Sequence, residues 1–348
     1  MVSEQPDHVW RRFAVWSTGL TIGLFALVVA ALYLIDPYDT GRSPLAREPW
    51  LKGQRPGDAT ASVGRNPKFT GAIIGNSTIA LIRPARLIEQ TGIPFAQLSM
   101  PAAPVRGQLT MLDWFVRHHP GKTDAIVMTI DRGTWCTRDP KLPTEKPFPF
   151  WLYSRSTLEY LQGLVRLSSL EQVARSFQTS RSTKVTGEDG FWDYEPMYEP
   201  LMRNPVRKKE VLFAKANDQH GNTVEPFPGA DALEAQLKSL PAETVLVLAM
   251  PPVFSAMQPA PKTPRHASYQ ACRKRFYDLA ARRPGAMLVD WWDDRPEFKN
   301  ADLFIDQVHI RRALADRFED AIIATLQRVK TSQSNVTPSL GNRSASAN

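Results

Sequence analysis

The sequence predicts an α/β fold, in which a parallel sheet is covered by helices on both faces, behind one helix that spans a membrane. Three observations predict this fold: an uncharged apolar segment near the start, five short apolar runs of strand length, and amphipathic segments between those runs. Strands that alternate with helices are typical of parallel sheets with both faces covered. With 43% hydrophobic residues, the 348-residue chain can bury a large core, which excludes a wholly disordered protein.

The first expected element is a transmembrane helix over residues 13–35, after a short tail of residues 1–12. Its 23 residues carry no charge, and a bilayer core needs about 20 apolar residues in a helix. The apolar core of a signal peptide is shorter, about 7–15 residues, so we expect an uncleaved anchor. Trp10, Trp16 and Tyr33 stand where interfacial aromatic residues occur.

Basic residues flank both ends of this segment and do not decide its orientation. Large domains that follow such a helix are translocated largely regardless of charge. We therefore expect the main domain on the outer side of the cytoplasmic (inner) membrane, in the periplasm or at the cell exterior. A buried core helix is the alternative, but the segment offers no polar outer face.

The rest of the chain is expected to form a linker over residues 36–68 and an α/β domain over residues 69–330. The linker is rich in Pro, Gly, Arg and Asp. Glycines and prolines bound the apolar runs and the amphipathic segments of the domain. The expected strands are 71–75, 94–99, 124–131, 244–250 and 286–290. The expected helices are 84–90, 105–118, 266–283 and 310–329.

A long insertion over about residues 137–240 separates the third and fourth strands. It contains helical patches such as 156–177 and two aromatic runs, 147–153 and 191–194. Two interpretations stay open, a cap packed over the site and a surface excursion that packs on itself. Residues 331–348 are rich in Ser and Asn, which is typical of a disordered tail.

Charge and composition limit the partners and cofactors. The net charge of +8 suggests an anionic partner such as a membrane surface, a polyanionic glycan or nucleic acid. The sequence contains no recognisable nucleic-acid-binding module, so we expect no nucleic acid partner. Two cysteines and six histidines leave little material for a metal site, and we expect no metal and no cofactor. Cys136 and Cys272 could pair in an oxidising compartment, but their spacing alone does not decide it.

Two distant segments carry residues suited to nucleophilic catalysis. Ser77 follows the first strand, and Asp306 and His309 precede the last helix. Ligands of open parallel sheets bind outside the carboxyl ends of the strands. A serine hydroxyl becomes a nucleophile when an imidazole takes its proton, and a carboxylate can orient that imidazole. The alternative is structural, because Ser77 or Asp306 could cap a helix and His309 could lie on the surface.

These residues resemble motifs of the SGNH/GDSL hydrolase superfamily. Gly75-Asn76-Ser77 resembles its first block and Asp306-Gln307-Val308-His309 its last. The resemblance implies a flavodoxin-like three-layer fold with a five-stranded parallel sheet in the order 2-1-3-4-5. It covers roughly residues 70–132 and 244–326 and does not extend to the insertion.

The apolar segment followed by Asp36-Pro37-Tyr38 resembles a narrower, membrane-anchored group. That group includes proteins that O-acetylate alginate and other exopolysaccharides and a protein that helps to D-alanylate teichoic acids. The resemblance implies an acyltransferase or esterase that acts on a cell-surface glycan in the periplasm. It also implies a membrane-embedded acyltransferase partner that delivers the acyl group.

The sequence departs from the superfamily at the expected oxyanion hole. The second block lacks its glycine, so we expect a backbone N–H of Ala102 or Ala103 to donate there. Asn76 is a further candidate for binding substrate. Asp131 stands near the place of the usual Asn, and an ionised carboxylate cannot donate a hydrogen bond. Asp131 is therefore expected to point elsewhere, for example toward Arg132, or oxyanion stabilisation is weaker.

Two other functions stay open at this point. One is a non-catalytic, anchored glycan-binding protein with a degenerate site, which Asp131 motivates. The other is a plain hydrolase of small esters.

Overall fold

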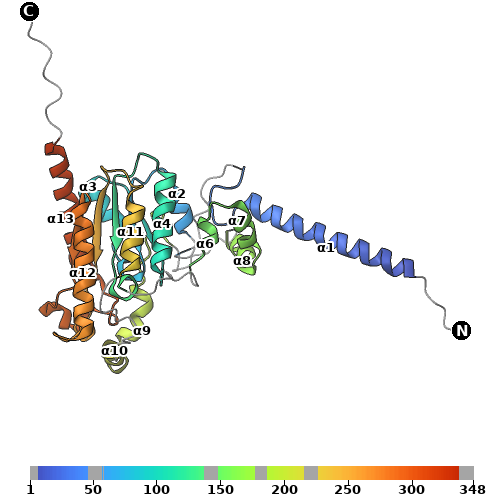
Figure 1. Ribbon diagram of the computed structural model, residues 1–348. Coiled ribbons are helices and arrows are strands. Elements are labelled where there is room, and N and C mark those ends of the chain that lie inside the picture. Colours follow the sequence, from blue (N-terminus) through green and yellow to red (C-terminus); the bar gives the residue numbers. More distant parts are fainter. Residues whose placement is uncertain are drawn as a thin grey trace, which may run out of the picture.

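The computed structural model describes residues 7–45, 57, 59–136, 148–176, 186–214 and 226–336. Its centre is a five-stranded, all-parallel sheet in the order β2-β1-β3-β4-β5 (Figure 1). This order confirms the expectation. The strands are β1 (Gly71–Gly75), β2 (Phe95–Ser99), β3 (Ala125–Thr129), β4 (Val245–Met250) and β5 (Ala286–Asp290).

Both faces of the sheet are buried because successive side chains of a strand point to opposite faces. Ile74 belongs to one core cluster and Ile73 to the other, and both are fully buried. The first cluster lies under α2 (Thr60–Arg65), α4 (Val105–His118), α11 (Pro228–Leu237) and α12 (Pro264–Arg282). The second lies under α3 (Pro84–Thr91) and α13 (Arg312–Val336). The result is a three-layer α/β/α domain (Figure 1).

Prolines and glycines in the sequence mark helix boundaries. Pro84 stands in the first turn of α3, where its missing N–H costs nothing. Gly92 ends that helix at φ 73°, a left-handed conformation that glycine adopts without strain. The last helix was expected to end at Val329 and instead continues to Val336. The remainder of the tail, residues 337–348, lies outside the described residues.

Helix α1 (Asp7–Ile35) extends away from the domain (Figure 1). It is long and apolar enough to cross a membrane, and only 6% of its most apolar window is buried by the rest of the protein. Large apolar side chains along it are exposed, for example Trp16 at 78% and Leu20 at 75%. These features agree with the expected membrane-spanning segment.

Much of the described part of residues 36–68 is buried, unlike the surface linker that its composition suggested. Asp36, Tyr38 and Asp39 are buried, and α2 packs beneath α4 as part of the core. The reason is that the polar side chains find partners: the Asp36 carboxylate accepts hydrogen bonds from Thr40 and Gly41. A Pro- and Gly-rich composition therefore describes ordered turns here.

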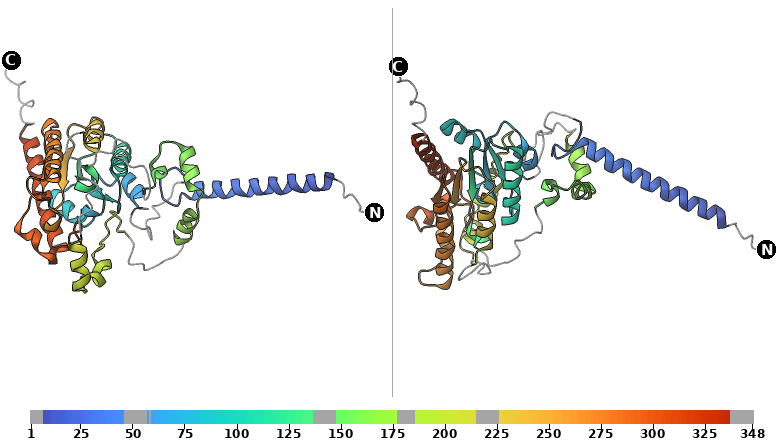
Figure 2. Two further views of the ribbon diagram at one scale, coloured as in Figure 1. Left: turned by 60° about the horizontal axis from the view of Figure 1, so that its bottom comes forward. Right: turned by 45° about the horizontal axis from the view of Figure 1, so that its top comes forward.

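The insertion divides into two parts that lie at different ends of the domain. The first comprises α6 (Phe150–Tyr153), α7 (Thr157–Leu164) and α8 (Leu167–Ser176), which lie at the inner end of α1 (Figures 1 and 2). The second comprises η2 (Glu195–Tyr198), α9 (Glu199–Met202) and α10 (Pro205–Leu212), which lie below the sheet in Figure 1. Helix α11, expected within the insertion, packs on α4 and α12 and belongs to the central domain.

A disulfide joins Cys136 to Cys272. Cys136 follows the short helix α5 (Arg132–Trp135), and Cys272 lies in α12. Both residues are fully buried. The pairing that the sequence left open is therefore present, and it ties the start of the insertion to the helix layer.

Candidate active site

Ser77, His309 and Asp306 form a hydrogen-bonded chain. The Ser77 Oγ lies 2.7 Å from His309 Nε2, and His309 Nδ1 lies 2.8 Å from Asp306 Oδ2. Because Nδ1 faces a carboxylate, it carries the proton, which leaves Nε2 free to accept the Ser77 O–H. The three residues that the sequence singled out are thus brought together across 232 positions of chain.

Ser77 is positioned by the end of β1. The strand stops at Gly75, and Ser77 begins the short helix η1 (Ser77–Ile79). A Cβ at Gly75 would lie 2.7 Å from Thr129, so only glycine fits between the strands there. The Asn76 Oδ1 accepts hydrogen bonds from the backbone N–H and the hydroxyl of Thr78, which caps η1. The capping role considered for Ser77 thus belongs to Asn76.

His309 is held by a tight loop before α13. One Asp306 oxygen accepts the backbone N–H groups of Val308 and His309 at 2.9 Å, while the other contacts the imidazole. The backbone N–H of Ile305 donates to the carbonyl of His309, which closes the loop. The D-x-x-H spacing therefore lets one carboxylate fix both the loop and the ring.

The pKa of Asp306 lies below its usual range. Burial raises the pKa of this carboxyl, but the hydrogen bond and charge of His309 and the two backbone N–H groups outweigh burial. Asp306 therefore stays ionised at neutral pH and can stabilise a protonated His309.

The Asp306→Asn variant is expected to lower turnover about 10³–10⁴-fold, because an amide no longer fixes the imidazole tautomer.

The same variant should also change the pH dependence of stability. The pKa of Asp306 is lower in the folded protein than in the unfolded chain, where it is about 3.9. The ionised carboxylate therefore stabilises the fold at pH values above about 3.9, and this stabilisation is lost as the pH falls below that value. Urea unfolding at pH 7 and pH 3 checks this. A stability difference from the parent chain that does not shrink at pH 3 would contradict it.

The structure leaves a reduced set of oxyanion donors. The Ala103 N–H already donates to the carbonyl of Met100, and one Asn76 amide hydrogen donates to Asp131 at 2.8 Å. Within the described residues, the backbone N–H groups of Ser77 and Ala102 donate to no protein acceptor. Ala102 stands in an exposed turn at φ 57°, beside the end of β1, since Met100 N–H donates to the carbonyl of Gly75. Ser77 and Ala102 are thus the candidate donors.

Asp131 has a structural role in this arrangement. Its carboxylate caps α5 by accepting the backbone N–H and hydroxyl of Thr134, and it holds the Asn76 amide. It does not pair with Arg132, whose guanidinium instead donates to Gln258 and to the carbonyl of Trp292. Burial raises the pKa of Asp131, and the surrounding donors partly offset this effect.

Two tyrosines of the insertion form a wall against His309. The ring of Tyr198 stacks on the imidazole with 6.4 Å between centroids, and the ring of Tyr194 meets its edge at 5.9 Å. Tyr194 is buried, which raises the pKa of its hydroxyl. The second part of the insertion therefore contacts the site, whereas the described part of the other aromatic run, residues 148–153, packs near α4. The aromatic residues of 191–194 were the only sequence signal for this wall.

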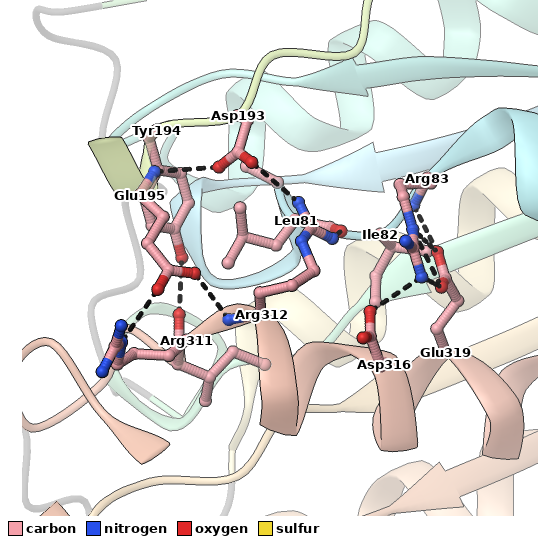
Figure 3. A network of polar contacts seen from close by, with 12 residues as sticks. Leu81, Ile82, Arg83, Asp193, Tyr194, Glu195, Arg311, Arg312, Asp316 and Glu319 are labelled. Atoms are coloured by element: carbon pink, nitrogen blue, oxygen red, sulfur yellow. Dashed lines mark hydrogen bonds and ion pairs between the residues drawn. The ribbon is translucent and has the colours of Figure 1, made fainter. Parts of the chain in front are cut away.

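Glu195 fastens this wall to the start of α13 (Figure 3). Its carboxylate accepts the Arg311 side chain at 2.8 Å and the Arg312 backbone N–H at 2.7 Å. Arg312 also donates to the carbonyl of Leu81, just beyond η1. Arg311 and Arg312 thus connect three segments of the site.

We expect Glu195→Gln to destabilise the protein by about 1–2 kcal/mol, since charge-assisted hydrogen bonds contribute roughly that much. It should also reduce turnover several-fold, because the wall against His309 loosens. The matched control is Glu199→Gln, whose surface partner Arg203 lies in a more exposed pair. Equal turnover in both variants would contradict this role for Glu195.

A cavity of about 430 Å³ opens at the carboxyl ends of β4 and β5. Arg132, Tyr269 and Trp292 line it, together with polar side chains of α12 and of the loops that follow β4 and β5. None of the three hydrogen-bonded residues lines it, but Arg132 follows Asp131, which contacts Asn76. Burial lowers the pKa of Arg132 to about 10. In the described residues, no group of three His, Cys, Asp or Glu side chains could hold a metal ion.

Comparison with known proteins adds no identification. No protein-family model matches the sequence, and no curated protein matches it.

Proposed function

We propose that this protein is a membrane-anchored serine acyltransferase or esterase that acts on a cell-surface polysaccharide. The observation that carries the proposal is the 2.7 Å contact between Ser77 Oγ and His309 Nε2, with Asp306 on the opposite ring nitrogen. A serine, an imidazole and a carboxylate in this order are the parts needed for acyl transfer. The resemblance to the anchored SGNH group favours O-acetyl transfer.

The reaction proceeds in two balanced steps. Ser77 Oγ attacks the acyl carbonyl while its proton passes to His309 Nε2. The tetrahedral intermediate then expels the donor's oxygen, which takes that proton, and leaves an ester on Ser77. A sugar hydroxyl or water next gives its proton to His309 and attacks the ester carbonyl. The acyl–Oγ bond then breaks, the acyl group leaves on the sugar oxygen or as the free acid, and His309 returns the proton to Ser77 Oγ. Asp306 stabilises the imidazolium in both steps.

Two features support an extracytoplasmic location. Helix α1 has the length and hydropathy of an anchor, and the Cys136–Cys272 disulfide is typical of oxidising compartments such as the periplasm. A cell-surface glycan and a membrane-embedded acyl donor would both be reachable there. The cavity beside Trp292 and Tyr269 is a candidate place for the acceptor, because aromatic rings and polar groups line it.

The experiment compares acylation of the cell-surface polysaccharide with hydrolysis of a small acetyl ester. The full chain should restore polymer acylation to cells that lack it, and His309→Ala should not. Rapid hydrolysis without a sugar acceptor would favour the esterase. Polymer acylation that persists in full with His309→Ala would overturn the catalytic proposal.

One observation favours a second candidate, an anchored glycan-binding protein. The Ala103 N–H and part of the Asn76 amide are engaged within the protein, which leaves two backbone donors for an oxyanion. A lost donor is worth about 3–4 kcal/mol of barrier. This candidate predicts that the full chain retains the polysaccharide on a column, while no acyl-enzyme forms during incubation with an activated ester.

A further inference from the structure

Helix α1 reaches the membrane boundary where it joins the domain. Its apolar segment of 23 residues is about 34 Å long at 1.5 Å per residue, and the hydrocarbon core of a bilayer is about 30 Å thick. The last turns of α1, up to Ile35, therefore lie at the level of the lipid headgroups. This step depends on the membrane anchor in the proposed function.

Those last turns are covered by the first part of the insertion. Leu32 is only 4% exposed, and the ring of Tyr33 meets that of Tyr160 in α7 with 6.4 Å between centroids. Both α7 and α8 contact α1 (Figure 2). Protein that packs on the headgroup-level turns of α1 must itself lie at the headgroup level.

The junction is rigid rather than a loose tether. The Tyr160 hydroxyl donates to the Asp36 carboxylate at 2.8 Å, directly after the end of α1. The same carboxylate accepts the backbone N–H groups of Gly41 and Arg42. Buried, charge-assisted hydrogen bonds of this kind fix the angle between α1 and α7.

Helices α7 and α8 expose a set of large apolar side chains, which we name the α7–α8 apolar face. The exposed fractions are 66% for Leu158, 46% for Val165, 74% for Leu167 and 48% for Leu170. Exposed clusters of this kind mark contact surfaces. Arg166 stands among them, with its guanidinium over the Trp151 ring at 4.7 Å. Leucines beside an arginine and an aromatic ring suit the boundary between acyl chains and headgroups.

We infer that the α7–α8 apolar face lies in the outer surface of the same bilayer that α1 spans. Lipid is the expected partner of this face, because α7 and α8, which carry the face, contact the part of α1 that lies at the membrane boundary. The leucines bury their side chains among the upper acyl chains, while Arg166 contacts lipid phosphates. This second contact fixes the orientation of the catalytic domain above the membrane.

Three labelled variants of the full chain in phospholipid nanodiscs test this inference. Leu167→Cys and Leu170→Cys probe the face, and Val206→Cys is the control, because Val206 is similarly exposed at 68% on α10, away from α1. Each receives an environment-sensitive fluorophore, and lipids that carry a doxyl quencher near the headgroup are added. The two native cysteines are paired and do not react without a reductant.

We expect labels at positions 167 and 170 to emit at shorter wavelength and to be quenched several-fold more strongly than the label at 206. Equal quenching at all three positions would overturn the inference. A blue shift without quenching by lipid would also overturn it, because the face would then be covered by protein.

A fourth label, at Ile22→Cys in the middle of α1, separates the two proposals. Quenching of this label by deep doxyl groups, with none at positions 167 and 170, overturns only the lipid contact of α7 and α8. Absence of quenching at position 22 removes the membrane anchor and the lipid contact of α7 and α8, whereas the catalytic part of the proposed function depends on the Ser77–His309 contact and is unaffected.

Discussion

Ser77→Ala is expected to reduce acyl-ester turnover by at least about 10⁴-fold, because the nucleophile of a serine triad cannot be replaced by solvent. The fold should persist, since the Ser77 hydroxyl contacts only His309 among the described side chains. The full chain is assayed in detergent. Turnover of an activated acetyl ester measures the activity, and the thermal unfolding midpoint measures whether the fold persists.

The matched control is Ser239→Ala. The Ser239 hydroxyl donates to a backbone carbonyl at the exposed end of α11, so its loss should leave turnover unchanged. A Ser77→Ala variant that turns over as fast as Ser239→Ala would show that Ser77 is not the nucleophile.

Loss of the Cys136–Cys272 disulfide is expected to have the largest effect on stability. The bond closes a loop of 136 residues, and loops of this length reduce the entropy of the unfolded chain enough to stabilise a protein by about 3–5 kcal/mol. Cys136→Ala, Cys272→Ala and the double variant should be destabilised to a similar extent, because each lacks the same bond. Urea unfolding of the full chain measures the change.

The Cys→Ala variants lose side-chain volume as well as the bond, so a reductant, which breaks only the bond, provides the control. It should lower the unfolding midpoint of the parent chain and leave that of the double variant unchanged. A parent chain whose midpoint does not respond to reduction would contradict a stabilising role for the disulfide.

Local sequence signals predicted the central sheet well. Short apolar runs of about four to eight residues between glycines and prolines favour buried strands, and the expected strand 71–75 coincides with β1. The helix over Val105–His118 was also predicted from apolar residues at helical spacing. These elements could be predicted because the spacing of apolar residues and the positions of prolines and glycines are local properties of the sequence.

Long-range pairing explains most of what was not predicted. Residues 36–40 are buried because the distant Tyr160 hydroxyl, together with local donors, satisfies the Asp36 carboxylate, which composition cannot reveal. The contact of Tyr198 with His309 likewise depends on the path of the insertion. The triad is the exception, because chemical complementarity between a strand-end serine and a D-x-x-H segment predicted a contact across the whole domain.

Asp131 was expected either to point away from the oxyanion, for example toward Arg132, or to weaken oxyanion stabilisation. In the structure it points away and caps α5 and holds Asn76, but it does not pair with Arg132. Side-chain direction at a strand end depends on the next turn, and several turns are compatible with one sequence.

Covalent labelling with a fluorophosphonate tests whether His309 activates the Ser77 hydroxyl. The full chain is treated with the probe in detergent at neutral pH, and the modified peptide is mapped by mass spectrometry. We expect a single modified serine, Ser77, and loss of labelling in His309→Ala, since the imidazole activates the hydroxyl. An unlabelled Ser77, or equal labelling with and without His309, would contradict it.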